Sequence, residues 1–125
     1  MLLRLPMLTA VAAFALAAPV LAQTAPAEAV KDLWCGTAFS LAARDAPPDP
    51  TEEDLALVKQ FVEGGAMLIE RAEAAHIAAG FTADQMIAIK ADLEPVVMEQ
   101  IGGSGENAQF TIEECSALLD PAAAQ

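Results

Sequence analysis

The sequence predicts an all-α fold, a small bundle of about four helices held by one disulfide. Apolar residues recur at spacings of three and four through most of the chain, and no strand-like alternation of apolar and polar residues is present. Capping boxes, in which threonine is followed three residues later by Gln or Glu, mark helix starts at Thr82 and Thr111. Tyrosine is absent and β-branched residues are sparse, which also disfavours a sheet. Short links between such helices favour a bundle.

Residues 1–22 are predicted to be a secretory signal. Arg4 supplies a positive start, and an uncharged apolar stretch follows over residues 7–18. Small residues precede Gln23, so we expect cleavage before it. A retained membrane anchor is the alternative, but the stretch is short for a span and ends at Pro19. We therefore expect a periplasmic or secreted protein that does not associate with the membrane after cleavage.

The remaining residues, 23–125, are predicted to form one strongly acidic domain. They hold five Lys and Arg against 18 Asp and Glu, a net charge of −13. Binding of nucleic acid or anionic lipid depends on Lys and Arg that neutralise phosphates, so both partners are disfavoured. A basic protein, a polycation or a metal cation remains compatible with this charge. Solubility alone is the simpler interpretation.

The first helix is predicted over residues 27–44. A wide apolar face, which includes Trp34 and Cys35, is typical of a helix largely enclosed by others. Gly36 lies in the middle of this helix, where glycine costs about 1 kcal/mol relative to alanine. A close crossing with another helix beside the disulfide would explain it.

The second helix is predicted over residues 51–79, after a proline-rich connector. Asp49 or Thr51 can cap it, and acidic residues in its first turn complement the helix dipole. Gly64-Gly65 predicts either a kink or the close approach of another backbone. Gly80 is expected to end the helix in a left-handed conformation.

Two further helices are predicted over residues 82–101 and 111–119. Pro95 is expected to kink the former or to divide it. A glycine-rich loop over residues 102–107 separates the two. The last helix is expected to bury the apolar residues Phe110, Ile112, Cys115, Leu118 and Leu119.

Cys35 and Cys115 are the only cysteines, and in an exported chain they are expected to form a disulfide. Both fall on apolar helix faces, which favours a buried structural bond. In the chain-entropy model, a disulfide that closes the long loop between these two cysteines stabilises the fold by about 4 kcal/mol. An intermolecular bridge or two free thiols are the alternatives.

No motif for a cofactor is present, and we expect none and no enzymatic activity. The chain lacks Cys-x-x-Cys, a phosphate-binding glycine loop and a calcium loop, and its serines stand in no catalytic pattern. One metal candidate is Glu70, Glu73 and His76, because Glu-x-x-His presents two ligands from one helix. A second such motif would be needed, and His76 is the only histidine. A solvated face, with His76 near Glu73, is the favoured interpretation.

Around Trp34-Cys35 and Cys115 the chain resembles small periplasmic helical proteins of the acid-stress chaperone type. In that family an aromatic–Cys pair begins a helix and one disulfide reaches a later helix. Here the second cysteine lies nearer the C-terminus than in that pattern. The resemblance implies an interaction protein whose apolar surface opens when carboxylates become protonated.

The leading functional hypothesis is an exported, non-enzymatic binding or chaperone-like protein with a protein partner. Its surface would use the apolar sides of the second and third helices, including Met67, Met86 and Met98. The alternative for each of these methionines, and the simpler one, is that it fills space in the core. One alternative is an acidic inhibitor or immunity-type protein for a basic exported partner. Another is a small-ligand carrier with a pocket near Gly64-Gly65.

Overall fold

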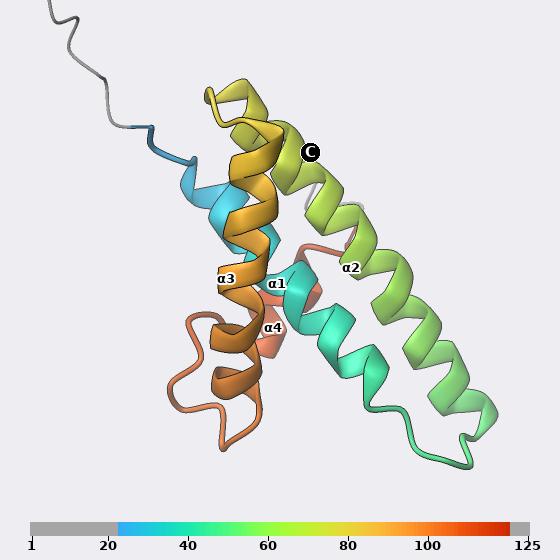
Figure 1. The fold of residues 1–125 in the computed structure, drawn as a ribbon. Coiled ribbons are helices and arrows are strands. Elements are labelled where there is room, and N and C mark those ends of the chain that lie inside the picture. The colour runs from blue at the N-terminus through green and yellow to red at the C-terminus, as the bar shows by residue number, and fades with distance from the viewer. Residues whose placement is uncertain (1–22, 121–125) are drawn as a thin grey trace, which may run out of the picture.

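The computed structural model describes residues 23–120, and within them it has four helices and no strand. The predicted all-α fold is confirmed (Figure 1). The predicted signal, residues 1–22, lies outside the described residues, as do residues 121–125. The helices are α1 (Ala27–Arg44), α2 (Glu52–Ala78), α3 (Ala83–Ile101) and α4 (Ile112–Ala117).

Helix α1 is the centre of the fold. Every residue from Asp32 to Phe39 is buried, so the middle of this helix is covered on all sides. It packs against α2, α3 and α4, whereas α2 and α3 contact each other only slightly. Figure 1 shows α1 between α2 and α3, which diverge from the turn that joins them. The apolar residues around α1 thus form the core, and the outer sides of α2 and α3 face solvent.

The close helix crossing predicted at Gly36 is present, and its partner is Gly65 of α2. A Cβ atom added to Gly36 would lie 2.9 Å from the carbonyl oxygen of Gly65, and one added to Gly65 would lie 3.0 Å from that of Gly36. Helix α2 runs through both of its glycines without interruption. Leu119 covers Gly64, at 2.7 Å from a Cβ added there. The backbone of α1 and the Leu119 side chain therefore occupy the space directly over the two glycines, and a small open hollow of about 230 Å³ borders Gly64.

The predicted helix ends agree with the structure to within one residue except in α4. Thr51, Thr82 and Thr111 each form a capping box, and Gly80 follows α2 with a φ of +100°. Helix α3 continues through Pro95, which is exposed, so the carbonyl that its missing N–H leaves unpaired can reach water. Of the two outcomes predicted at Pro95, a kink or a division of the helix, the division does not occur.

The last helix differs from the prediction in length and in one buried residue. Helix α4 ends at Ala117, two residues early. Ile112 is exposed, although it was expected in the core. Cys115 fixes which side of this short helix faces α1, and Ile112 at its first residue lies beyond that contact. Ile112 instead lines an open hollow with Met98 and Ile101.

Two groups of apolar residues make up the core. The larger surrounds Trp34, Phe39 and the disulfide, and the smaller contains Leu33, Ala72 and Met86. Phe39 stacks on Phe61 of α2, with ring centroids 5.1 Å apart. The core therefore follows α1 along its length. It becomes thinner toward the start of α2, on the N-terminal side of Phe61.

Candidate functional site

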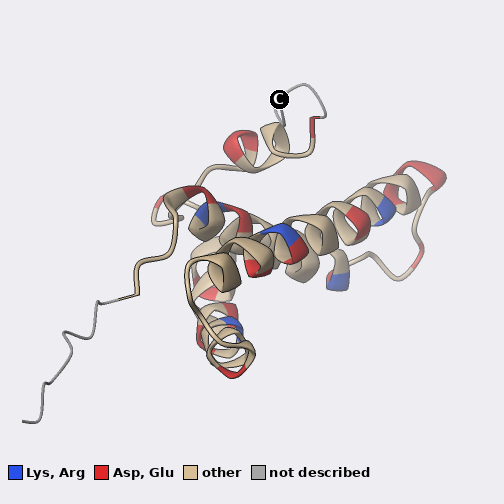
Figure 2. Ribbon diagram, turned by 90° about the horizontal axis from the view of Figure 1, so that it is seen from above, with Lys and Arg blue, Asp and Glu red and all other residues tan. Residues whose placement is uncertain are grey.

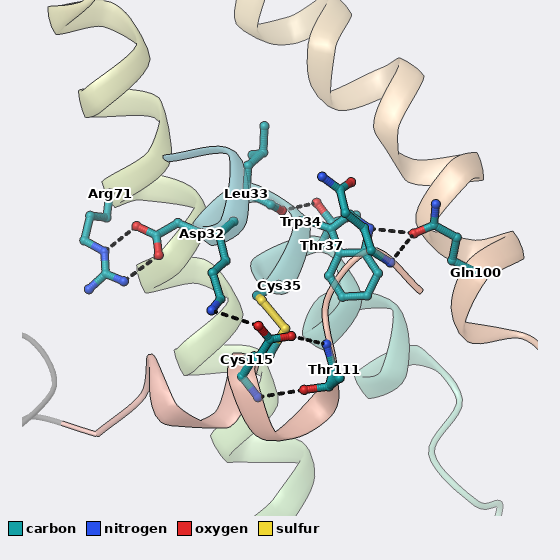
Figure 3. The surroundings of a disulfide bond; sticks show 12 residues. Asp32, Leu33, Trp34, Cys35, Thr37, Arg71, Gln100, Thr111 and Cys115 are labelled. Atoms are coloured by element: carbon teal, nitrogen blue, oxygen red, sulfur yellow. Dashed lines mark hydrogen bonds and ion pairs between the residues drawn. A yellow bond between two sulfur atoms is a disulfide. The ribbon is translucent and has the colours of Figure 1, made fainter. Parts of the chain in front are cut away.

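The predicted disulfide between Cys35 and Cys115 is present. The S–S distance is 2.03 Å, the two Cα atoms are 5.3 Å apart, and both residues are buried. Figure 3 shows the bond joining α1 to α4 beneath Trp34. Because both cysteines of the sequence are in this bond and neither sulfur is accessible, the geometry fits a structural role.

Polar contacts on either side of the disulfide fix the chain around it. The indole N–H of Trp34 donates to Oε1 of Gln100 at 2.9 Å, and the backbone N–H of Gln109 donates to the same oxygen at 3.1 Å. On the other side, Lys31 lies 3.6 Å from Glu114. The backbone N–H of Thr111, together with Lys31, lowers the pKa of Glu114. The short helix α4 is thus held by side chains from α1 and α3 as well as by the sulfur bond.

A second link between α1 and α2 was not predicted from the sequence. Asp32 accepts two hydrogen bonds from Arg71, both at 2.6 Å, as Figure 3 shows. The Asp32 side chain is only 8% exposed, whereas that of Arg71 is 40% exposed. The carboxylate raises the pKa of Arg71. Residues 39 positions apart in the chain form this pair, so no local pattern indicates it.

The structure does not bring the metal candidate residues Glu70, Glu73 and His76 together. His76 is 2% exposed, and its Nδ1 donates to the carbonyl oxygen of Ala72 at 2.6 Å. Glu73 instead forms an ion pair with Lys90 of α3. Within residues 23–120 no group of three or more His, Cys, Asp or Glu is placed to hold a metal ion.

The burial of His76 has a local cause. Its ring lies edge-on to Phe81, at a centroid distance of 5.2 Å. Phe81 follows the glycine turn that ends α2, and its N–H bonds back to the carbonyl of His76. The expected apolar contact after Gly80 therefore covers the histidine, and the favoured solvated face for His76 is wrong.

An open hollow, which we call the α1–α2 groove, lies along one side of the helix pair. It has a volume of about 550 Å³. Helix α1 contributes Ser40, Ala43 and Arg44, and α2 contributes Val62, Ala66, Ile69, Glu70 and Glu73. The hollow at Ile112 is smaller, about 450 Å³, and lies between α1, the end of α3 and the start of α4. Both have largely apolar linings.

The positive charges of residues 23–120 are all in contact with carboxylates of the same chain. Their five Lys and Arg side chains form the ion pairs Lys31–Glu114, Arg44–Glu94, Lys59–Glu63, Arg71–Asp32 and Lys90–Glu73. Most Asp and Glu are left without a Lys or Arg partner. Figure 2 shows acidic residues on every helix and grouped where the connector enters α2.

Comparison of the chain with protein-family models, curated proteins and solved structures found no match in any of the three. The resemblance to acid-stress chaperones therefore stays a prediction. Within residues 23–120, no helix combines the length and apolar character that crossing a membrane requires.

Proposed function

We propose that this chain is an exported, non-enzymatic binding protein that holds apolar segments of other proteins in a chaperone-like manner. The observation that carries the proposal is the uncovered apolar surface of α2 and α3. Of ten large apolar side chains that are exposed within residues 23–120, five lie on α2 and three on α3. Where such side chains adjoin one another, as Leu55 and Val62 do on one side of α2, exposed apolar surface is typical of an interaction site.

The arrangement of the helices explains why this surface exists. Because α1 occupies the centre, α2 and α3 bury their inner sides against it and have little contact with each other. Met67 and Met98 are exposed, whereas Met86 is buried in the core. Methionine adapts its shape to different partners, so the two exposed methionines suit a surface that accepts varied segments.

Export and acid response belong to the same proposal. A disulfide between buried cysteines is the kind that persists in an oxidising compartment, which supports export. In acid, protonation of the unpaired carboxylates removes both their mutual repulsion and their hydration. We expect the apolar surface to bind unfolded clients more strongly under those conditions.

The direct test is suppression of aggregation of an unfolded client protein, followed by light scattering at neutral and acid pH. Binding of an environment-sensitive dye reports exposed apolar surface in parallel. We expect suppression that increases in acid and is reduced in a Met67→Ser/Met98→Ser variant, with Ala74→Ser on exposed α2 surface as the control. No suppression at any pH down to acid unfolding would contradict the proposal.

A second candidate is an acidic inhibitor or immunity-type protein that blocks a basic exported partner. It is favoured by the finding that each Lys and Arg of residues 23–120 already forms an ion pair within the chain. A basic partner would therefore meet no unpaired positive charge that repels it. Electrostatic steering of this kind weakens with salt. Capture of an exported basic enzyme at low salt, with inhibition of its activity, would distinguish this candidate from the first.

A further inference from the structure

One face of α2 carries a continuous row of apolar residues that the fold leaves largely uncovered. We call it the α2 stripe, and its residues are Leu55, Val58, Val62, Ala66 and Ile69. Their spacings of three and four place them on one side of the helix. Leu55 is 54% and Val62 53% exposed, and Ala66 is also exposed, whereas Val58 and Ile69 are half-buried, Ile69 against the core. The stripe spans about 21 Å of helix, which is about four turns.

The C-terminal half of the stripe forms one wall of the α1–α2 groove. Val62, Ala66 and Ile69 face Ala43 and Arg44 of α1 across a volume of about 550 Å³. The small side chains of Ala43 and Ala66 leave room for a larger side chain to enter between the helices. The N-terminal half lies nearer the start of α2 than the Phe39–Phe61 stack, and Leu55 is exposed there. One elongated segment can therefore contact α2 along the stripe and insert side chains into the groove.

The charged residues beside the stripe indicate whether the bound segment should be positively or negatively charged. Glu52 and Glu70 are about five helical turns apart and lie on the same flank of the stripe. Neither is paired with a Lys or Arg, since all five such side chains of residues 23–120 contact other carboxylates. Glu63 lies on this flank between them, already paired with Lys59. The flank is thus negative at both ends and neutralised in the middle.

A second copy of this chain is a poor occupant. Residues 23–125 carry five basic against 18 acidic residues, a net charge of −13, so two copies repel each other. A copy would also bring no unpaired Lys or Arg from its described residues to Glu52 or Glu70. Charge complementarity requires a basic partner, and the length and shape of the apolar contact fit a helix laid in a groove.

We propose that the α2 stripe and the α1–α2 groove bind a basic amphipathic helix of another protein, with its apolar side on Leu55, Val62 and Ile69 and its Lys or Arg beside Glu52 and Glu70. This inference rests on the proposed binding function and names its site and the chemistry of its partner. The apolar contact supplies affinity, while the acidic flank selects positively charged helices and speeds their association.

The test is a titration of the disulfide-intact protein into fluorescently labelled peptides, followed by anisotropy. The probe is a Leu/Lys peptide of about 18 residues patterned as an amphipathic helix. A peptide of the same composition in scrambled order controls for non-specific attraction. We expect the patterned peptide to bind about tenfold more tightly than the scrambled one, because only it aligns its leucines on the stripe.

Two charge-matched variants separate the stripe from general electrostatics. Val62→Glu places a carboxylate in the stripe, and Ile112→Glu places one at the start of α4, where Ile112 is 59% exposed. Each adds one negative charge. We expect Val62→Glu to weaken binding of the patterned peptide about tenfold, because an apolar contact is replaced by a carboxylate that must lose its water. Ile112→Glu, outside the apolar surface of α2 and α3, should leave the affinity within about twofold.

The acidic flank is tested in the same way with Glu70→Gln and, on exposed α3 surface, Glu99→Gln. Each removes one negative charge, and we expect Glu70→Gln to weaken binding by about threefold and Glu99→Gln by less. Equal effects of Val62→Glu and Ile112→Glu, or equal binding of both peptides, would overturn the inference. So would a dimer, detected by sedimentation, that Val62→Glu abolishes, because the occupant would then be a second copy.

The client-aggregation assay on the same preparations separates this inference from the proposed function. Suppression of aggregation without selective binding of the patterned peptide overturns the basic-helix site and leaves a binding function on other surfaces. Loss of both overturns both. Suppression together with selective binding that Val62→Glu removes supports the site.

Discussion

Substitution of Gly36 by alanine adds one methyl group where α1 crosses α2. The new Cβ would lie 2.8 Å from Cγ1 of Ile69, 2.9 Å from the carbonyl oxygen of Gly65 and 3.1 Å from the backbone nitrogen of Ile69. The Ile69 side chain can rotate away, but the two backbone atoms cannot. Relief therefore requires that the two helices move apart along their contact.

Two opposing effects set the size of the change. In an open helix, alanine is favoured over glycine by about 1 kcal/mol. Overpacking a tight contact costs about 1–3 kcal/mol, and contacts with backbone belong at the upper end of that range. We therefore expect Gly36→Ala to lower the free energy of unfolding by about 2 kcal/mol.

Urea unfolding followed by far-ultraviolet circular dichroism, with the disulfide intact, measures this difference. Gly103→Ala is the matched control, because no atom lies within 4 Å of a Cβ added in that exposed loop. It should change the free energy of unfolding by less than about 0.5 kcal/mol. A Gly36→Ala protein as stable as the original, or more stable, would refute the close α1–α2 crossing.

Four further changes, three substitutions and one reduction, test other links in the fold. Arg71→Met should destabilise the protein by about 3 kcal/mol, because it leaves the Asp32 carboxylate buried without a partner. Asp32→Asn should lower the free energy of unfolding by less, since Arg71 can reach solvent. Equal losses of stability for the two variants in urea unfolding would contradict this difference. Reduction of Cys35–Cys115 should remove about 4 kcal/mol of stability, and an unchanged urea midpoint under reductant would show that the bond adds little. Because its pKa is lowered in the fold, Glu114 stabilises the protein at neutral pH, and this contribution is lost as the pH falls through the folded pKa. The stability difference between the original protein and Glu114→Gln should therefore shrink in acid titrations, and a constant difference would contradict the assignment.

The parts of the fold that follow from neighbouring residues were predictable from the sequence. Capping at Thr82 and Thr111 and the end of α2 at Gly80 depend on local backbone geometry that few residue types satisfy. The Cys35–Cys115 pair followed from the count of two cysteines and from their positions on apolar helix faces. Gly36 indicated a close crossing because glycine is unfavourable in a helix unless space requires it.

Features that depend on distant residues were not predictable in this way. The Asp32–Arg71 pair arises only once α1 and α2 are packed, and neither residue differs in its local pattern from exposed ones. The burial of His76 is not visible in its local pattern. Phe81 covers the histidine only because the chain turns back at Gly80. The sequence shows the apolar row on α2 but not that Leu55 and Val62 stay exposed, because that depends on where the other helices pack.

The most direct test of binding along α2 is a map of backbone amide chemical shifts as the patterned Leu/Lys peptide is added. We predict that the largest changes lie along the stripe from Leu55 to Ile69 and at Ala43 on the opposite wall of the groove, with the amide of Ile87 unchanged. Changes centred on α3 or α4, or none at peptide concentrations that saturate anisotropy, would contradict the proposed site.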